Sequence, residues 1–248
     1  MPRVRVVKKK RRLLNSLRGI SHRFTKQEVG HILIAWIVLS FAFTFAFDSG
    51  IYSIGFALAF CASAVVLGCG FIMHELMHKF TAQKYRYHAT FIMWPWGILL
   101  ALVTSLFGMI FAAPGATYFE PDPREQYLDP NGFTKRYGII SLAGPKINII
   151  FGFIFFGLFL LSINLLAHSA GYIAVFILLV TSFGSYINFY LAAFNMLPIN
   201  PLDGYKVFNW SRRIWFTVFA LAVGMTIINF IYVYPTIIYI LLRVLPSI

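Results

Sequence analysis

Six long apolar runs, separated by short polar or charged segments, dominate the pattern of the chain. They cover approximately residues 32–47, 54–80, 91–113, 138–166, 171–198 and 214–246. A helix needs about 20 apolar residues to cross a bilayer, so most of these runs are long enough to span it. The last run suits one tilted helix or two short helices broken near Pro235. The pattern predicts an all-α polytopic membrane protein with about six transmembrane helices.

The run at 91–113 differs from the others because glycine and proline interrupt it. The interrupting and bordering residues are Pro95, Gly97, Gly108, Pro114 and Gly115. Between them lie short β-branched or aromatic stretches, which favours a re-entrant β-hairpin or a small membrane-embedded sheet between the second and third transmembrane helices. Such a segment is tolerated at membrane depth only where protein or a polar cavity satisfies its backbone. The alternative is an ordinary transmembrane helix from Gly97 to Ala113.

Composition indicates an integral membrane protein with one domain. Of the 248 residues, 59% are hydrophobic and only 12% are Asp, Glu, Lys or Arg, whereas a soluble domain carries about 25% charged residues. The first 26 residues are basic, and no short apolar region with a small-residue cleavage site follows them, so no cleavable signal peptide is expected. Cys61 and Cys69 lie on one predicted helix and cannot form a disulfide without breaking it.

Positive charge is concentrated before the first apolar run, where 10 of the 21 Lys and Arg residues lie. The positive-inside rule therefore places the N-terminus in the cytoplasm. We expect the basic tail to lie against anionic lipid of the bilayer, and we expect no nucleic-acid partner. The chain then divides into a basic cytoplasmic segment (1–30), a membrane core (31–213) and one or two C-terminal transmembrane segments (214–248).

An ionisable cluster of His74, Glu75 and His78 ends the second apolar run. The H-E-x-x-H spacing puts both imidazoles on one face of a helix, where they can chelate one zinc ion while Glu75 reaches an adjacent water. Ionisable groups in an apolar helix are costly unless they are paired or bind a metal. The pattern therefore predicts a metal site.

A catalytic zinc needs a third protein ligand and an open position for water. Solvated positions are favoured for six other acidic residues, namely Glu28, Asp48, Glu120, Asp122, Glu125 and Asp129. Asp203 differs, because it follows a long apolar run and two helix-breaking prolines, Pro198 and Pro201. If the run at 91–113 does not cross the membrane, two membrane crossings separate His78 from Asp203. Both residues then lie on the cytoplasmic side. Asp203 is the predicted third ligand.

Three motifs, in this order, resemble the signatures of the site-2 protease family of intramembrane zinc metalloproteases. They are the H-E-x-x-H in a membrane helix, SLAGPKINI at 141–149 and NMLPINPLDG at 195–204. The resemblance extends from about Ile32 to Arg213. It implies that His74, His78 and Asp203 bind one Zn²⁺ per chain and that Glu75 is the general base.

The resemblance also implies roles for residues in the other two motifs. Asn195 matches an asparagine that contacts the substrate carbonyl or the developing oxyanion. Gly144, Pro145 and Asn148 match the middle motif, whose small residues let the third spanning helix pack closely against the catalytic core, and we favour this structural role for them. Tyr205 stands where the family commonly has a second glycine.

Together these features predict a zinc-dependent endopeptidase that hydrolyses peptide bonds within or near transmembrane segments of other membrane proteins. The active site is expected towards the cytoplasmic side, and an exposed strand in the 86–118 region could pair with an unwound substrate by β-augmentation. Two other classes remain, a non-catalytic membrane adaptor of the same fold and a metal transporter. A transporter needs access from both sides, and polar residues on the outward side are sparse.

Overall fold

The computed structural model describes residues 24–46, 56–111, 113–122, 124–166 and 172–244. The chain is mostly helical with one small sheet. In chain order the elements are α2 (Lys26–Ala46), α3 (Phe56–Leu67), η2 (Gly68–Ile72), α4 (Met73–Lys84), β1 (His88–Met93), α5 (Pro95–Ser105), β2 (Gly115–Glu120), α6 (Glu125–Leu128), α7 (Pro130–Leu166), α8 (Tyr172–Asn195), α9 (Asp203–Trp210), α10 (Arg212–Ile228), η3 (Asn229–Val233) and α11 (Tyr234–Val244).

Five helices among the described residues are long and apolar enough to cross a membrane. They are Lys26–Ala46, Phe56–Lys84, Pro130–Ile163, Ile173–Asn195 and Arg212–Ile240. The sequence pattern predicts about six, and the difference lies in the last run, which continues as one helix through Pro235. The π-helical segment η3 ends two residues before this proline, and local π-helical adjustment is one way in which a membrane helix accommodates a proline.

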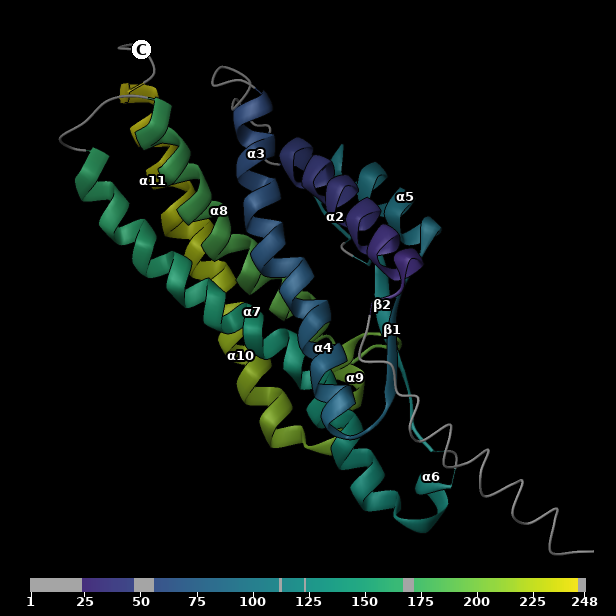
Figure 1. Cartoon of the computed structure of the whole chain (residues 1–248). Helices are drawn as coiled ribbons and strands as arrows, with labels where there is room; N and C mark the ends of the chain where they lie inside the picture. The colour runs from purple at the N-terminus through teal and green to yellow at the C-terminus, as the bar shows by residue number, and fades with distance from the viewer. Residues whose placement is uncertain (1–23, 47–55, 112, 123, 167–171, 245–248) are drawn as a thin grey trace, which may run out of the picture.

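The long helices form two groups (Figure 1). The continuous helix α3–η2–α4 lies beside α7, α8 and α10–η3–α11 as a bundle, while α2 and α5 lie together beside α3. Successive long helices run in alternate directions, so the end of α4, the start of α7 and the end of α8 lie at the same end of the bundle. This end also holds α9, which contacts α7 and α10. His78 and Asp203 therefore lie at one end, as an even number of crossings requires.

The predicted small sheet lies between the second and third long helices. β1 and β2 pair antiparallel, in a register that runs from His88↔Glu120 to Met93↔Gly115. Trp94 N extends the ladder by donating to Pro114 O over 2.8 Å. Because the two strands are antiparallel, the chain returns along β2 to the end of the sheet at which β1 begins. Helix α5 lies in the connection between the two strands.

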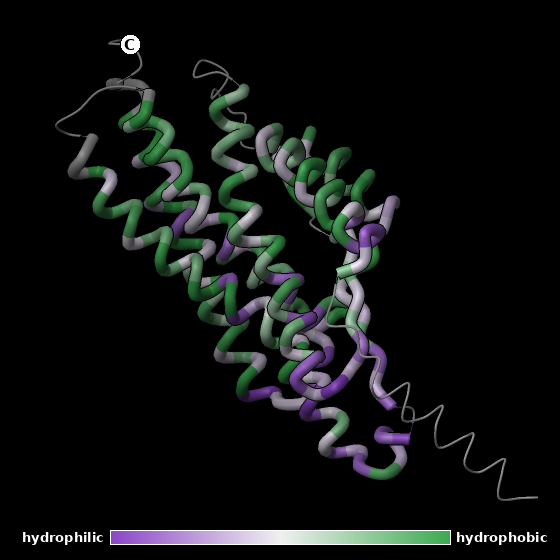
Figure 2. Tube along the Cα trace, viewed as in Figure 1, coloured by the Kyte–Doolittle hydropathy of each residue, from purple (hydrophilic) through white to green (hydrophobic). Residues whose placement is uncertain are grey.

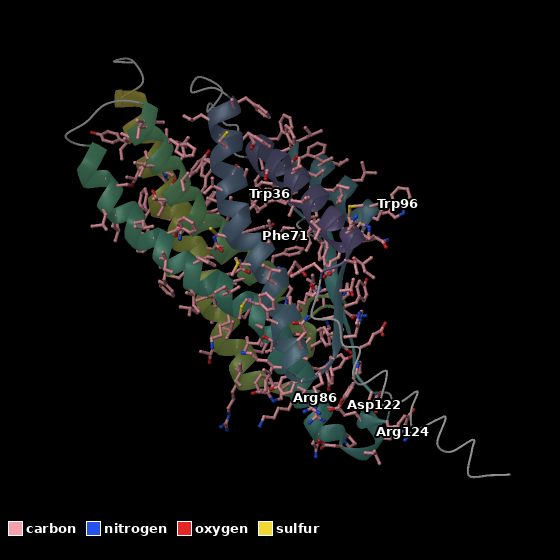
Figure 3. All side chains as sticks on the ribbon, viewed as in Figure 1. Trp36, Phe71, Arg86, Trp96, Asp122 and Arg124 are labelled. Carbon is pink, nitrogen blue, oxygen red and sulfur yellow. The ribbon has the colours of Figure 1, made fainter. Side chains whose placement is uncertain are left out.

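Helix α5 is too short to be the transmembrane helix that was the alternative for this run. Its 11 residues extend about 16 Å, against a hydrocarbon core of about 30 Å. Its buried residues, Gly97, Ala101 and Ser105, recur every fourth position and so form one small-residue face; α5 contacts α2. Trp96 stands on the outer side of α5 and is 72% exposed (Figure 3).

Two aromatic contacts hold the α2 and β1 side of the molecule to the bundle. Trp36 and Phe71 lie between these two parts (Figure 3). The Trp36 indole donates from Nε1 to Ala64 O of α3 over 2.9 Å. Phe71 of η2 packs edge-on against Phe91 of β1, with ring centroids 5.8 Å apart. These contacts fix the sheet next to the helix that carries the H-E-x-x-H motif.

The solvated position predicted for Glu28 is wrong, because this residue forms a buried ion pair. Glu28 on α2 is 1% exposed and Lys79 on α4 is 2% exposed. The Lys79 ammonium donates to Glu28 Oε1 over 2.7 Å, and the same oxygen accepts from Phe91 N of β1 over 3.0 Å. Lys79 also lies 4.0 Å from the centroid of the Phe24 ring. One carboxylate therefore connects α2, α4 and β1.

Polar residues are concentrated at the end of the bundle that holds α6 and α9. Figure 2 shows hydrophobic colour over most of the long helices and hydrophilic colour around this end. Arg86, Asp122 and Arg124 lie here (Figure 3). Arg136 of α7 pairs with Glu125 and Asp129 at the same end. Asp48 and the basic residues before 24 lie outside the described residues, so their predicted positions remain expectations.

Candidate metal centre

Three potential metal ligands meet where α4 faces the start of α9. His74 and His78 lie one turn apart on α4, and Asp203 is the first residue of α9. The two Nε2 atoms are 3.0 Å apart, and Asp203 Oδ2 lies 3.3 Å from that of His74 and 2.9 Å from that of His78. All three residues are buried. Residues 125 positions apart in the chain thus present three ligand atoms to one point.

Both imidazole rings are oriented by hydrogen bonds at their other nitrogen. His78 Nδ1 donates to Ile140 O over 2.8 Å, and His74 Nδ1 donates to Asn148 Oδ1. The orientation of the Asn148 amide follows from its own donor bonds, since Nδ2 donates to Gly70 O and to Asn188 Oδ1. Because each Nδ1 donates to an oxygen, the Nε2 atoms are the ring nitrogens that face Asp203, and they can bind a metal when they carry no proton.

This donor set fits zinc. Two imidazoles and one carboxylate are the kind of three-residue set that catalytic zinc sites use, with a fourth position left for water. Ligand atoms on a tetrahedral zinc lie about 3.4 Å apart, given metal-ligand distances of about 2.0–2.2 Å. The three separations here, 3.0, 3.3 and 2.9 Å, are all within about half an ångström of that value. Three acceptors this close repel one another unless a cation lies among them.

Asp203 is held as a carboxylate by its surroundings. Burial raises the pKa of its carboxyl group, but positive charge on His78 and hydrogen bonds from both histidines outweigh burial and hold the pKa below its usual range. Lys206, one turn further along α9, adds a positive charge 4.0 Å from Asp203 Oδ1. Asp203 is therefore held in the deprotonated form that can bind a metal.

Gly204 fixes the position of Asp203 through a close backbone contact. A Cβ atom at Gly204 would lie 2.1 Å from Met196 O, so a larger residue would push α9 away from the end of α8. The next residue, Tyr205, is 43% exposed and lies within α9. Tyrosine in place of the second glycine therefore leaves the ligand-bearing turn helical.

Gly144 lets α7 approach the two histidines. A Cβ atom there would lie 2.4 Å from His78 Nε2 and 2.5 Å from His74 Nε2.

We therefore expect Gly144→Ala to displace both rings and to weaken zinc affinity at least about 10-fold, the loss typical when ligand orientation is disturbed. Competition titration with a chromophoric chelator measures this affinity. Gly157→Ala is the matched control on the same helix, since no atom lies within 4 Å of its added Cβ; equal weakening in both variants would contradict the prediction.

Glu75 lies beside the three ligands and is held by the sheet. It is 7% exposed, and it directly follows His74 in α4. Its Oε2 accepts a hydrogen bond of 2.7 Å from Thr117 Oγ1 on β2. Among the described residues, no donor bonds its other oxygen, Oε1. Oε1 therefore keeps both of its accepting positions for a proton, whereas Thr117 occupies one position on Oε2.

Comparison with known proteins agrees with this geometry. The chain is 40% identical over 194 residues to "Putative zinc metalloprotease MJ0611" of Methanocaldococcus jannaschii, covering 78% of this chain and 89% of the relative. The chain belongs to this family of zinc metalloproteases. It is also 31% identical over 159 residues to "Putative zinc metalloprotease YwhC" of Bacillus subtilis, covering 58% of this chain and 65% of the relative. No family model matches, and no solved structure gives a significant match.

The structure of the metalloprotease places most, but not all, of the predicted site residues together. His74, His78 and Asp203 form the candidate metal centre, and Glu75 follows His74 in α4. Asn195, the last residue of α8, instead donates from Nδ2 to Leu191 O of its own helix over 3.0 Å. Its expected contact with substrate stays a prediction.

Two residues of the site have contacts that sequence reasoning missed. The sequence favours a helix-packing role for Asn148, yet its amide orients the His74 ring. The sequence does contain an indication of this role. An asparagine inside a long apolar run must find hydrogen-bond partners when it is buried. Thr117 gave no signal of its own, because a threonine in a predicted strand is ordinary.

Proposed function

We propose that this membrane metalloprotease is a site-2-type intramembrane protease, which hydrolyses peptide bonds within or near transmembrane segments of membrane-protein substrates. The observation that carries the proposal is the convergence of His74, His78 and Asp203, because both histidines and Glu75 lie on a helix that has the length and hydropathy of a membrane span. A buried ionisable cluster of this kind is functional by default.

The chemistry follows from the donor set and from Glu75. When bound by the three ligands, zinc supplies a Lewis acid that polarises a carbonyl and acidifies water to a pKa of about 7. Glu75 Oε1 would accept the proton from the attacking water and then deliver it to the nitrogen of the leaving amine. The peptide C–N bond breaks, and the water oxygen stays on the new carboxylate.

Asn195 is proposed to stabilise the developing oxyanion. Its amide donates to Leu191 O in this structure, so it would exchange that bond for one to the substrate carbonyl. Removal of such a donor costs about 10²–10³ in rate. Its place at the end of α8, eight positions before Asp203, puts it on the segment that leads to the third ligand.

The free edge of β2 is proposed to bind the unwound substrate. Phe91 N points away from β2, towards Glu28, and Phe91 pairs with Thr117. In an antiparallel pair this makes Phe91 and Thr117 a non-hydrogen-bonded pair, so the backbone N–H and C=O of Thr117 point to the opposite edge. Among the described residues, Thr117 N donates to no backbone oxygen in a loop or turn. An extended substrate could therefore add to the sheet beside Glu75.

The proposed orientation places the active site towards the cytoplasm. The Lys and Arg residues near the α9 end of the bundle are Lys84, Arg86, Arg124, Lys135, Arg136, Lys206, Arg212 and Arg213. By the positive-inside rule this end is cytoplasmic, as is the N-terminus. The exposed apolar face of α5 would then contact lipid, and the basic residues before 24 would lie near anionic headgroups.

Cleavage of a defined membrane substrate tests the proposal. The purified protein is incubated in detergent with single-span proteins, one of which carries a helix-breaking Gly-Pro pair within its span, and the products are identified by mass spectrometry. We expect cleavage within or near the span, stronger for the helix-broken substrate, inhibited by 1,10-phenanthroline and restored by added zinc. No cleavage of any substrate by zinc-loaded protein would favour the adaptor, and zinc uptake into proteoliposomes would favour the transporter.

A further inference from the structure

The hydroxyl of Thr117 makes a buried contact with Glu75 across 42 positions of sequence. Thr117 lies in the middle of β2 and is 7% exposed. Its Oγ1 lies 2.7 Å from Glu75 Oε2 and 3.3 Å from the backbone O of the same residue. The shorter contact has the length expected for a hydroxyl that donates to a carboxylate.

This contact leaves the two carboxylate oxygens of Glu75 in different environments. Oε2 accepts from Thr117, while no described residue donates to Oε1. A carboxylate fixed through one oxygen cannot rotate freely, so the position of the other is determined as well. We propose that Thr117 is a positioning residue that directs Glu75 Oε1 towards the reacting water. This inference rests on the proposed proteolytic function and adds a residue to its machinery.

Thr117 also connects Glu75 to the strand edge. Its side chain holds the carboxylate, while its backbone N–H and C=O point to the free edge of β2. A substrate strand that pairs at this edge would be bound by the same residue that orients Glu75. Thr117 alone would then fix the distance between the bound peptide and the general base Glu75. A proton transfer requires this kind of preorganisation.

The kinetic test compares Thr117→Val, Thr117→Ser and Thr90→Val. Valine keeps the shape but loses the hydroxyl, and serine keeps the hydroxyl. Thr90, on β1, is a threonine that does not contact Glu75 through a hydrogen bond. For Thr117→Val we expect kcat to fall about 10- to 100-fold with KM and zinc content unchanged, since proton transfer by a positioned group contributes about 10²–10⁴. We expect Thr117→Ser to recover most of kcat, and Thr90→Val to match wild type.

The outcomes separate this inference from the proposed function. Wild-type kcat in Thr117→Val would overturn the inference while leaving proteolysis intact. A loss of kcat that serine does not restore, or a rise in KM alone, would also overturn it, because either result indicates a packing or binding role. Absence of cleavage by zinc-loaded wild-type protein would instead reject the proposed function.

A second readout does not depend on activity. In zinc-free protein, Thr117→Val leaves a buried carboxylate without its donor, and the apparent melting temperature should fall by about 2–4 °C. The same change in a Glu75→Ala background should cost less, because no carboxylate remains to be satisfied. Equal shifts in the two backgrounds would show that the hydroxyl and the carboxylate do not interact, and would overturn the inference.

Discussion

Glu75→Gln is expected to abolish detectable proteolysis while the zinc content stays at the wild-type value. Glutamine has nearly the same shape and can still accept a hydrogen bond from Thr117, but its amide cannot take a proton from water at neutral pH. General acid–base catalysis by a positioned group contributes about 10²–10⁴ in rate, so the loss of kcat should be at least of that order. Zinc analysis and the cleavage assay are run on the same preparation, since Glu75 is not among the three converging ligands.

Asp122→Asn is the matched control for this substitution. It also exchanges a carboxylate for an amide, but Asp122 is exposed in the loop after β2 and keeps an oxygen that can accept from Arg124 N. We expect wild-type cleavage from this variant. Cleavage by Glu75→Gln at the wild-type rate would contradict the assigned general base, and loss of zinc from Glu75→Gln would show that Glu75 contributes to metal binding.

Removal of one partner of the Glu28–Lys79 ion pair is expected to destabilise the protein strongly. Both side chains are almost completely buried, and Glu28 also accepts from Phe91 N. Either Glu28→Gln or Lys79→Met leaves a charge in the interior without its counter-charge, which typically costs about 3–5 kcal/mol of unfolding free energy. For a chain of this size, the melting temperature in detergent should fall by on the order of 10 °C.

The double variant separates charge pairing from packing. Glu28→Leu combined with Lys79→Met removes both charges, so much of the lost stability should return, although Phe91 N loses its acceptor. Asp129→Asn, in the exposed pair with Arg136, should leave the melting temperature nearly unchanged. Single variants as stable as wild type would show that the pair is not buried in the folded protein.

The parts of the site that sequence reasoning predicted are those encoded locally. H-E-x-x-H needs only helical periodicity to place His74 and His78 on one face. Asp203 could be predicted as the third ligand because few acidic residues follow an apolar run. The number of membrane crossings between His78 and Asp203 also decides whether both lie at the same end of the bundle. The sheet between α4 and α7 was predictable because glycine and proline interrupt that run.

The parts that were missed depend on contacts between distant segments. The bonds from His74 to Asn148, from Glu75 to Thr117 and from Glu28 to Lys79 join residues 74, 42 and 51 positions apart. The sequence predicts a solvated Glu28 because this residue lies beside a basic segment, whereas its partner, Lys79, is on another helix. The last apolar run was ambiguous for a different reason, since a proline breaks some helices and is accommodated by others.

Zinc content is the measurement that tests the three-ligand site most directly. Detergent-purified wild type is compared with Asp203→Ala and with the double variant His74→Ala, His78→Ala by metal analysis after dialysis. The geometry predicts about one zinc per chain in wild type, a marked reduction in Asp203→Ala and complete loss in the double variant. Zinc retained at the wild-type amount in Asp203→Ala would contradict the choice of third ligand, and a wild-type protein that binds no zinc would contradict the metal centre itself.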